Sequence, residues 1–177
     1  MYRSLTLALA ALVVSAGCAS TNIGTYATRG LDLRQYKTYA WGEPDHAATG
    51  DPRLDNNEIF EKRVRAAVDD ELAGRGLTKT TGTPDLIVHY HAGVAQEVSE
   101  PDIDPDYTYD YHDEGRDPYV YRKGTLFVDL VDPASKRLVW RGWAEGSVDG
   151  VIDDQDLLEK RIDDAVARIL AKLPGTI

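Results

Sequence analysis

The chain has 177 residues, of which 42% are apolar and 28% charged, and its formal net charge at pH 7 is −10. This composition is typical of a soluble globular domain, and the strong negative charge argues against nucleic acid and anionic lipid headgroups as direct partners. The sequence has neither a Gly-x-Ser-x-Gly nucleophile motif nor a phosphate-binding glycine loop, so we expect no enzymatic activity and no cofactor.

The first 17 residues have the features of a secretory signal peptide. Arg3 precedes a short apolar run over residues 5–16, and small residues lie just before Cys18, the only cysteine. Residues 12–18, LVVSAGC, resemble the lipobox of bacterial lipoproteins, in which the chain is cut before the cysteine and its thiol is acylated. Ser15 departs from that motif, which usually has leucine there. The alternatives are an ordinary signal peptide and an uncleaved anchor, but the apolar run is shorter than the roughly 20 residues that span a bilayer.

The lipobox resemblance implies a division of the chain into three parts. Residues 1–17 are the signal peptide, residues 18–30 form an acylated tether, and residues 31–177 form a single domain. Acyl chains on Cys18 would attach the mature chain to a membrane. Ala19 is not the aspartate that, by resemblance to the sorting rule of such lipoproteins, retains them in the inner membrane. We therefore expect an outer-membrane location facing the periplasm.

The first half of the domain shows alternating strand and helix patterns. A short strand is expected near residues 25–28, and aromatic and β-branched residues in alternation predict a strand over residues 36–41. Apolar residues at 3.6-residue spacing predict an amphipathic helix over residues 57–75, which Gly76 ends. Residues 85–92 are predicted to form a central strand, because both of its faces begin apolar.

Residues 95–120 break this pattern. They are rich in acids, prolines and tyrosines and have no hydrophobic period, so they predict a long loop. Residues 121–131 and 137–147 then predict a β-hairpin, and residues 154–173 a second amphipathic helix. The order of these elements predicts an α+β fold, in which a mainly antiparallel sheet has both helices packed on one face.

Four segments of the domain carry a pattern that is specific in combination. They are YKTYAW at 36–41, PDLIVHYH at 84–91, GTLFVDLVDP at 124–133 and LVWRGWA at 138–144. Together they resemble the domain-of-unknown-function 4136 family of bacterial envelope lipoproteins, and the resemblance extends from about residue 22 to residue 174. It implies a location and a fold, and it carries no catalytic or binding residue onto this chain.

Two groups of residues are candidate cation ligands. Three aspartates at alternate positions suggest calcium: Asp102, Asp104 and Asp106. Against this, Tyr107 stands where the usual calcium loop has glycine. His89 and His91 are two apart on a strand and therefore point to the same face, and with His112 they suggest a transition metal. The alternatives are a solvated acidic loop and polar residues on a sheet face.

Tyrosines interleaved with charged residues are the candidate partner-binding residues: Tyr107, Tyr109, Tyr111 and Tyr119. Tyrosine offers a large, rigid contact area with a polar tip, which suits a glycan or a protein, whereas the alternative is that these rings cover a sheet edge. Trp140 and Trp143 alternate onto opposite faces of their strand, which places at least one in the core. Asp129 and Glu145 are interpreted as surface charge rather than as a hydrolytic pair.

The sequence therefore predicts a membrane-anchored lipoprotein with a non-catalytic binding or structural role in the cell envelope. Its expected partners are the membrane, through acyl chains on Cys18, and an envelope protein or glycan, with no nucleic acid. The alternative is a metal- or calcium-dependent periplasmic binding protein that uses the acidic loop and the histidines.

Overall fold

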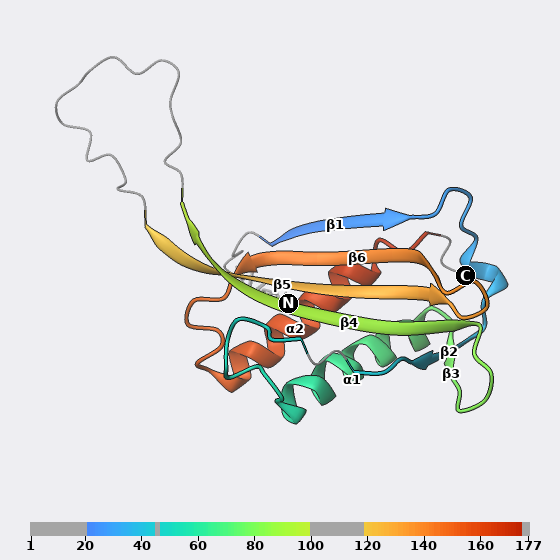
Figure 1. Ribbon diagram of the computed structural model, residues 1–177, viewed down its shortest axis with the longest axis horizontal. Helices are drawn as coiled ribbons and strands as arrows, with labels where there is room; N and C mark the ends of the chain where they lie inside the picture. The colour runs from blue at the N-terminus through green and yellow to red at the C-terminus, as the bar shows by residue number, and fades with distance from the viewer. Residues whose placement is uncertain (1–20, 45–46, 100–118, 175–177) are drawn as a thin grey trace, which may run out of the picture.

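A computed structural model describes residues 21–44, 47–99 and 119–174 of the chain. Its elements, in chain order, are β1 (Asn22–Ala27), the 3-10 helix η1 (Leu33–Gln35), β2 (Thr38–Trp41), α1 (Glu58–Gly74), β3 (Thr78–Lys79), β4 (Leu86–Val98), β5 (Val120–Asp132), β6 (Arg137–Ser147) and α2 (Gln155–Leu170). The strands form one six-stranded sheet in the order β1-β6-β5-β4-β2-β3 (Figure 1). This arrangement confirms the predicted α+β fold.

The sheet is mixed, with its long strands antiparallel. β4, β5, β6 and β1 pair antiparallel in that order, whereas β2 pairs parallel with both β4 and β3. The parallel pairing arises because α1 lies between β2 and β4 in the chain, and a helical crossover returns the chain in its original direction. The two-residue strand β3 was not predicted, because the sequence around residues 78–79 resembles a connecting loop.

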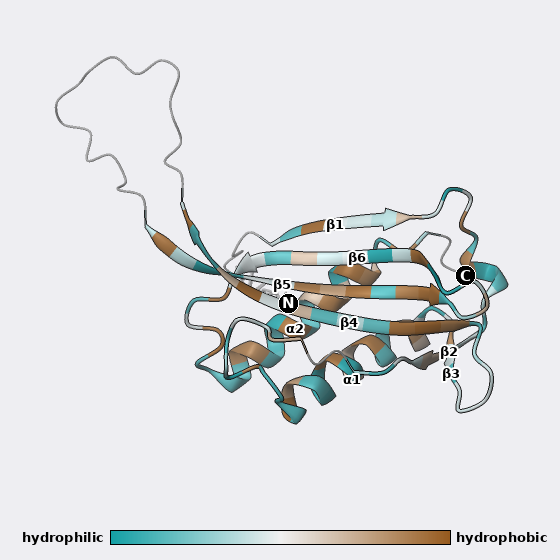
Figure 2. Ribbon diagram, in the orientation of Figure 1, coloured by the Kyte–Doolittle hydropathy of each residue, from teal (hydrophilic) through white to brown (hydrophobic). Residues whose placement is uncertain are grey.

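Both helices pack on one face of the sheet. Each helix begins at a side chain that caps its free backbone N–H groups: Asn57 accepts from Ile59 and Phe60, and Asp154 accepts in the same way at α2. Figure 2 shows hydrophilic and hydrophobic residues alternating along α1 and α2, as the 3.6-residue spacing predicts.

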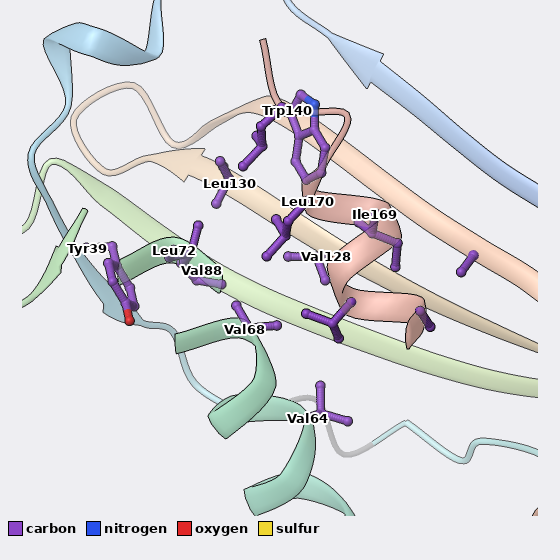
Figure 3. Packing of buried hydrophobic residues seen from close by; sticks show 14 of the residues in the cluster. Tyr39, Val64, Val68, Leu72, Val88, Val128, Leu130, Trp140, Ile169 and Leu170 are labelled. Atoms are coloured by element: carbon purple, nitrogen blue, oxygen red, sulfur yellow. The ribbon is translucent and has the colours of Figure 1, made fainter. Parts of the chain in front are cut away.

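The core lies between the helices and the sheet. One cross-strand row of Val88, Leu130 and Trp140 is fully buried beneath the helices. Figure 3 shows these side chains directed toward those of the helices, which come from α1 (Val64, Val68, Leu72) and from α2 (Ile169, Leu170). Burial of this apolar surface supplies the main stabilisation of the fold.

Asp69 joins α1 to the short strands at one side of the sheet. Its carboxylate accepts hydrogen bonds from the Tyr39 hydroxyl at 2.7 Å, from Trp41 Nε1 at 2.8 Å and from Lys79 Nζ at 2.8 Å. Burial of the carboxyl opposes its ionisation, but these hydrogen bonds outweigh burial and hold the pKa of Asp69 below its usual value. The ionised carboxylate thus fixes β2 and β3 against the helix.

Two boundaries differ from the sequence prediction. The tether expected over residues 18–30 overlaps β1, because residues 22–27 pair with β6 from Glu145 to Trp140. The loop expected over residues 95–120 is shorter at both ends, because β4 continues to Val98 and β5 begins at Val120, opposite it. These strand ends extend beyond β6 as a two-stranded arm (Figure 1). No helix in the described part of the chain is long and apolar enough to span a bilayer.

A buried carboxylate, Asp51, ties the segment before α1 to the sheet. It is 5% exposed, accepts a hydrogen bond from Arg53 Nε at 2.8 Å and lies 3.5 Å from Arg122 Nη1 on β5. The hydrogen bonds from Arg53 outweigh burial and lower the pKa of Asp51 from 3.8 to about 2. From the segment before α2, Asp153 forms ion pairs with both arginines and Asp149 forms one with Arg122.

The low pKa of Asp51 predicts a loss of stability in acid. Because the folded-state pKa lies below the unfolded value, the carboxylate stabilises the fold above about pH 4, and this contribution disappears as the pH falls toward about 2. Asp51→Asn should lower the free energy of unfolding by about 1–2 kcal/mol at pH 6 and much less at pH 2.5. Urea unfolding at both pH values measures this, with Asp70→Asn on the exposed side of α1 as the control. A loss of equal size at both pH values would contradict the prediction.

Candidate functional site

The face of the sheet opposite the helices carries polar and aromatic side chains, and no element in the described part of the chain covers it. Strand alternation places there every second residue of the three central strands. The register aligns His89, Asp129 and Arg141 in one row and His91, Phe127 and Trp143 in the next. We call these six residues the open face.

Asp129 is buried although it lies on this uncovered face. It is only 4% exposed, because neighbouring side chains surround it. Arg141 donates from Nε to Oδ1 at 2.6 Å and from Nη2 to Oδ2 at 2.5 Å, and His91 Nε2 lies 3.6 Å from Oδ2. These hydrogen bonds raise the pKa of Arg141. The bidentate pair compensates the buried charge and fixes the plane of the guanidinium group.

Aromatic rings lie beside the ion pair. The Arg141 guanidinium carbon is 5.3 Å from the centre of the Phe127 ring, and that ring is 6.2 Å from the ring of Trp143. The indole of Trp143 lies across β1 over Gly24, where an added Cβ would come within 2.1 Å of it. The absence of a side chain at Gly24 therefore leaves room for the indole over the neighbouring strand.

His89 lies against a second glycine in the same manner. A Cβ at Gly42 would come within 2.0 Å of the imidazole, so only glycine leaves this space. His89 and His91 lie on one face, as their spacing predicts, but in different surroundings, since His91 approaches Asp129. Among the described residues no three His, Cys, Asp or Glu side chains come together as a metal site would require. Asp102, Asp104, Asp106 and His112 lie outside the described residues, so the metal and calcium hypotheses stay predictions.

Charged and tyrosine side chains continue from the open face onto the arm. Lys123 Nζ lies 2.5 Å from Glu97 and 3.8 Å from Glu145, and Tyr121 donates to Glu97 at 3.4 Å. Tyr119 is 62% exposed, and its ring centre is 6.0 Å from that of Tyr121. Three other predicted partner-binding tyrosines lie outside the described residues, as does the predicted lipidation site: Tyr107, Tyr109, Tyr111 and Cys18.

Sequence reasoning placed Trp143 and Asp129 on strands but did not bring them together. Arg141 and Phe127 were not identified as site residues at all. The available signal was the alternation along the two hairpin strands, which puts Phe127, Asp129, Arg141 and Trp143 on the face opposite Trp140. The structure adds the cross-strand register that pairs Asp129 with Arg141.

Several solved structures are similar to this chain, and two of them, with TM-scores above 0.5, share its fold. A PDZ domain protein from Parabacteroides distasonis is 18% identical with a TM-score of 0.58, and the match covers 88% of this chain but only 36% of that one, so this chain spans about a third of that protein's length. A PelC dodecamer from Paraburkholderia phytofirmans is 10% identical with a TM-score of 0.51, over 89% of this chain and 100% of that one. A DUF4136 family protein from Bacteroides thetaiotaomicron is 10% identical with a TM-score of 0.48, over 84% and 95% of the two chains.

At these identities the likeness concerns the fold alone. A comparison with curated proteins found no match. A family model described as a domain of unknown function, DUF4136, matches residues 24–175. The matched stretch contains both helices and almost the whole sheet, including every residue of the open face. The chain therefore belongs to the DUF4136 family, as the sequence resemblance predicts.

Proposed function

We propose that the protein is a lipoprotein of the cell envelope that binds a saccharide chain on its open face without catalysing a reaction. Acyl chains on Cys18 hold it on the periplasmic side of the outer membrane. The observation that carries the binding role is Asp129, a buried carboxylate paired with Arg141 on a sheet face that no described element covers. An ion pair of this kind fixes donor groups in place beside the half-buried rings of Phe127 and Trp143.

The side chains around the pair suit a saccharide. Sugar rings present flat C–H faces that pack on aromatic rings, and their hydroxyl groups bond to fixed polar side chains. Trp143 and Phe127 supply the rings, and Arg141 supplies donors whose orientation Asp129 maintains. Tyr26, 62% exposed on β1, lies beside Arg141 in the same row and extends the surface.

The charges of the open face support a binding role rather than acid–base chemistry. Both carboxylate oxygens of Asp129 accept hydrogen bonds from Arg141, so the carboxylate orients the guanidinium group rather than contacting a ligand itself. The chain carries a formal charge of −10, which repels anionic lipid headgroups, so membrane attachment depends on the acyl chains.

Binding of soluble peptidoglycan glycan fragments to the Cys18→Ser chain tests the proposal. Calorimetry should give saturable heat with the parent chain, and Trp143→Ala should weaken the affinity at least tenfold, or by about 1.4 kcal/mol, because the stacking surface is lost. Ile59→Ala, which removes an exposed side chain on α1, should leave the affinity unchanged. Absence of saturable binding by the parent chain, or an equal effect of both variants, would refute the saccharide site.

A further inference from the structure

An apolar pocket opens between the helices and the sheet, at the end of the sheet where the arm leaves. Its volume is about 80 Å³. The sheet contributes Ala92, Leu126 and Ala144, and the helices contribute Phe60, Leu158 and Ile162. It lies on the helix side of the sheet and is separate from the open face.

The pocket exists because side chains become small along the core side of the sheet. The row Val88–Leu130–Trp140 fills the space under the helices. Two rows further toward the arm, the register instead aligns Ala92–Leu126–Ala144, and then Val94–Gly124–Gly146. The helices do not move closer to the sheet where its side chains become smaller, so an apolar space is left between them.

The N-terminal segment reaches this pocket. Thr21 lines it and is held by two side chains of α2: Arg168 Nη2 donates to the Thr21 carbonyl at 2.9 Å, and Arg161 Nη1 to its hydroxyl at 3.4 Å. Cys18 is three residues before Thr21. Its Cα therefore lies within about 11 Å of the Thr21 Cα, since consecutive Cα atoms are about 3.8 Å apart.

We propose that one acyl chain on Cys18 folds back and places a run of methylene groups in this pocket, while the remaining chains enter the bilayer. The proposal rests on the lipidation in the proposed function. A cavity needs roughly 10–15 Å³ to hold one group the size of a water molecule. The volume of this pocket therefore accommodates a short run of methylene groups but not a whole acyl chain. Arg161 and Arg168, which bind Thr21, fix the point from which the acyl chain on Cys18 would enter the pocket.

This arrangement also orients the domain. With one acyl chain in the pocket and the others in the bilayer, the end of the sheet where β1 begins faces the membrane. The open face, on the other side of the sheet, is then not pressed against the lipid. The competing occupant is an acyl chain of a separate phospholipid, which the same apolar walls would accept.

A photoactivatable fatty acid, incorporated into the full chain during expression, tests the proposal. After purification in detergent and irradiation, peptide mapping should find intramolecular cross-links from Cys18 to residues 120–126 and 156–165. Ala92→Leu narrows the pocket and should reduce these cross-links at least fivefold. Ala95→Leu, the same change on the exposed opposite side of β4, should leave them unchanged.

The outcomes separate this proposal from the lipidation on which it rests. Intact mass shows whether Cys18 is acylated in each variant, and thermal unfolding shows whether each variant is folded. If the wild-type chain is acylated but its cross-links reach only detergent or phospholipid, the pocket assignment is overturned while the lipidation stands. The wild-type chain alone is enough for this test. If added photoactivatable phospholipid forms cross-links with the pocket of the acylated protein, the pocket holds a phospholipid chain, and the assignment to the Cys18 acyl chain is overturned. A chain without acyl groups would overturn both.

Discussion

Replacing Trp140 by alanine is expected to lower the free energy of unfolding by about 3–5 kcal/mol, the usual cost of removing a fully buried tryptophan. The side chain has no exposed surface, and it packs over Gly142 and beside Ile169 of α2. The cavity left behind would lie between β6 and α2, in the row that closes the core. For a domain of this size such a loss is a large fraction of the total stability.

Trp143→Ala is the matched control. It removes the same side chain from the same strand, three residues further on, but from the opposite face. Since that indole packs over Gly24 but keeps some exposure to solvent, we expect a smaller cost of about 1–2 kcal/mol. Chemical denaturation of both variants measures the difference. Equal losses would contradict the assignment of one face to the core and the other to binding.

Local patterns predicted the helices and the central strands well. The apolar stripes of 3.6-residue period place the start of each helix within one residue of its observed first residue, which follows the capping residues Asn57 and Asp154. The opposite faces of Trp140 and Trp143 follow from strand alternation alone, and the structure confirms Trp140 as core. In these elements local preference and tertiary packing agree.

The strand boundaries that differ from the prediction are set by pairing rather than by local pattern. β1 is an edge strand that begins three residues before the strand expected near residues 25–28, because residues 22–24 also pair with the free edge of β6. Residues Ala95 to Val98 resemble a loop in composition, yet each finds a partner on β5, from Lys123 to Val120. A sequence pattern in one strand does not contain the register with another.

The candidate site was missed for the same reason. Asp129 and Arg141 are 12 residues apart in the chain and carry no motif. They become a pair because β5 and β6 align them, with an irregularity in the register between Leu130 and Val131. Gly24 was assigned to a tether, although its lack of a side chain is what accommodates Trp143.

Replacing Cys18 by serine is expected to move nearly all of the protein from the membrane fraction to the soluble fraction. Each buried methylene of an acyl chain contributes about 0.8 kcal/mol to membrane binding, so two or three chains give stable attachment where one chain is only marginal. The serine hydroxyl does not replace the thiol as acyl acceptor, and the net negative charge of the chain offers no electrostatic substitute. The domain should still fold, because its core is formed by residues of the sheet and the helices.

Intact mass and fractionation of the native protein, beside Cys18→Ser, test the central claim most directly. The claim predicts a mass equal to residues 18–177 plus acyl chains, with membrane association that disappears in the variant. A soluble native protein whose mass shows no acyl group would contradict it, and the protein would then be a free domain in which only the open face remains to be tested.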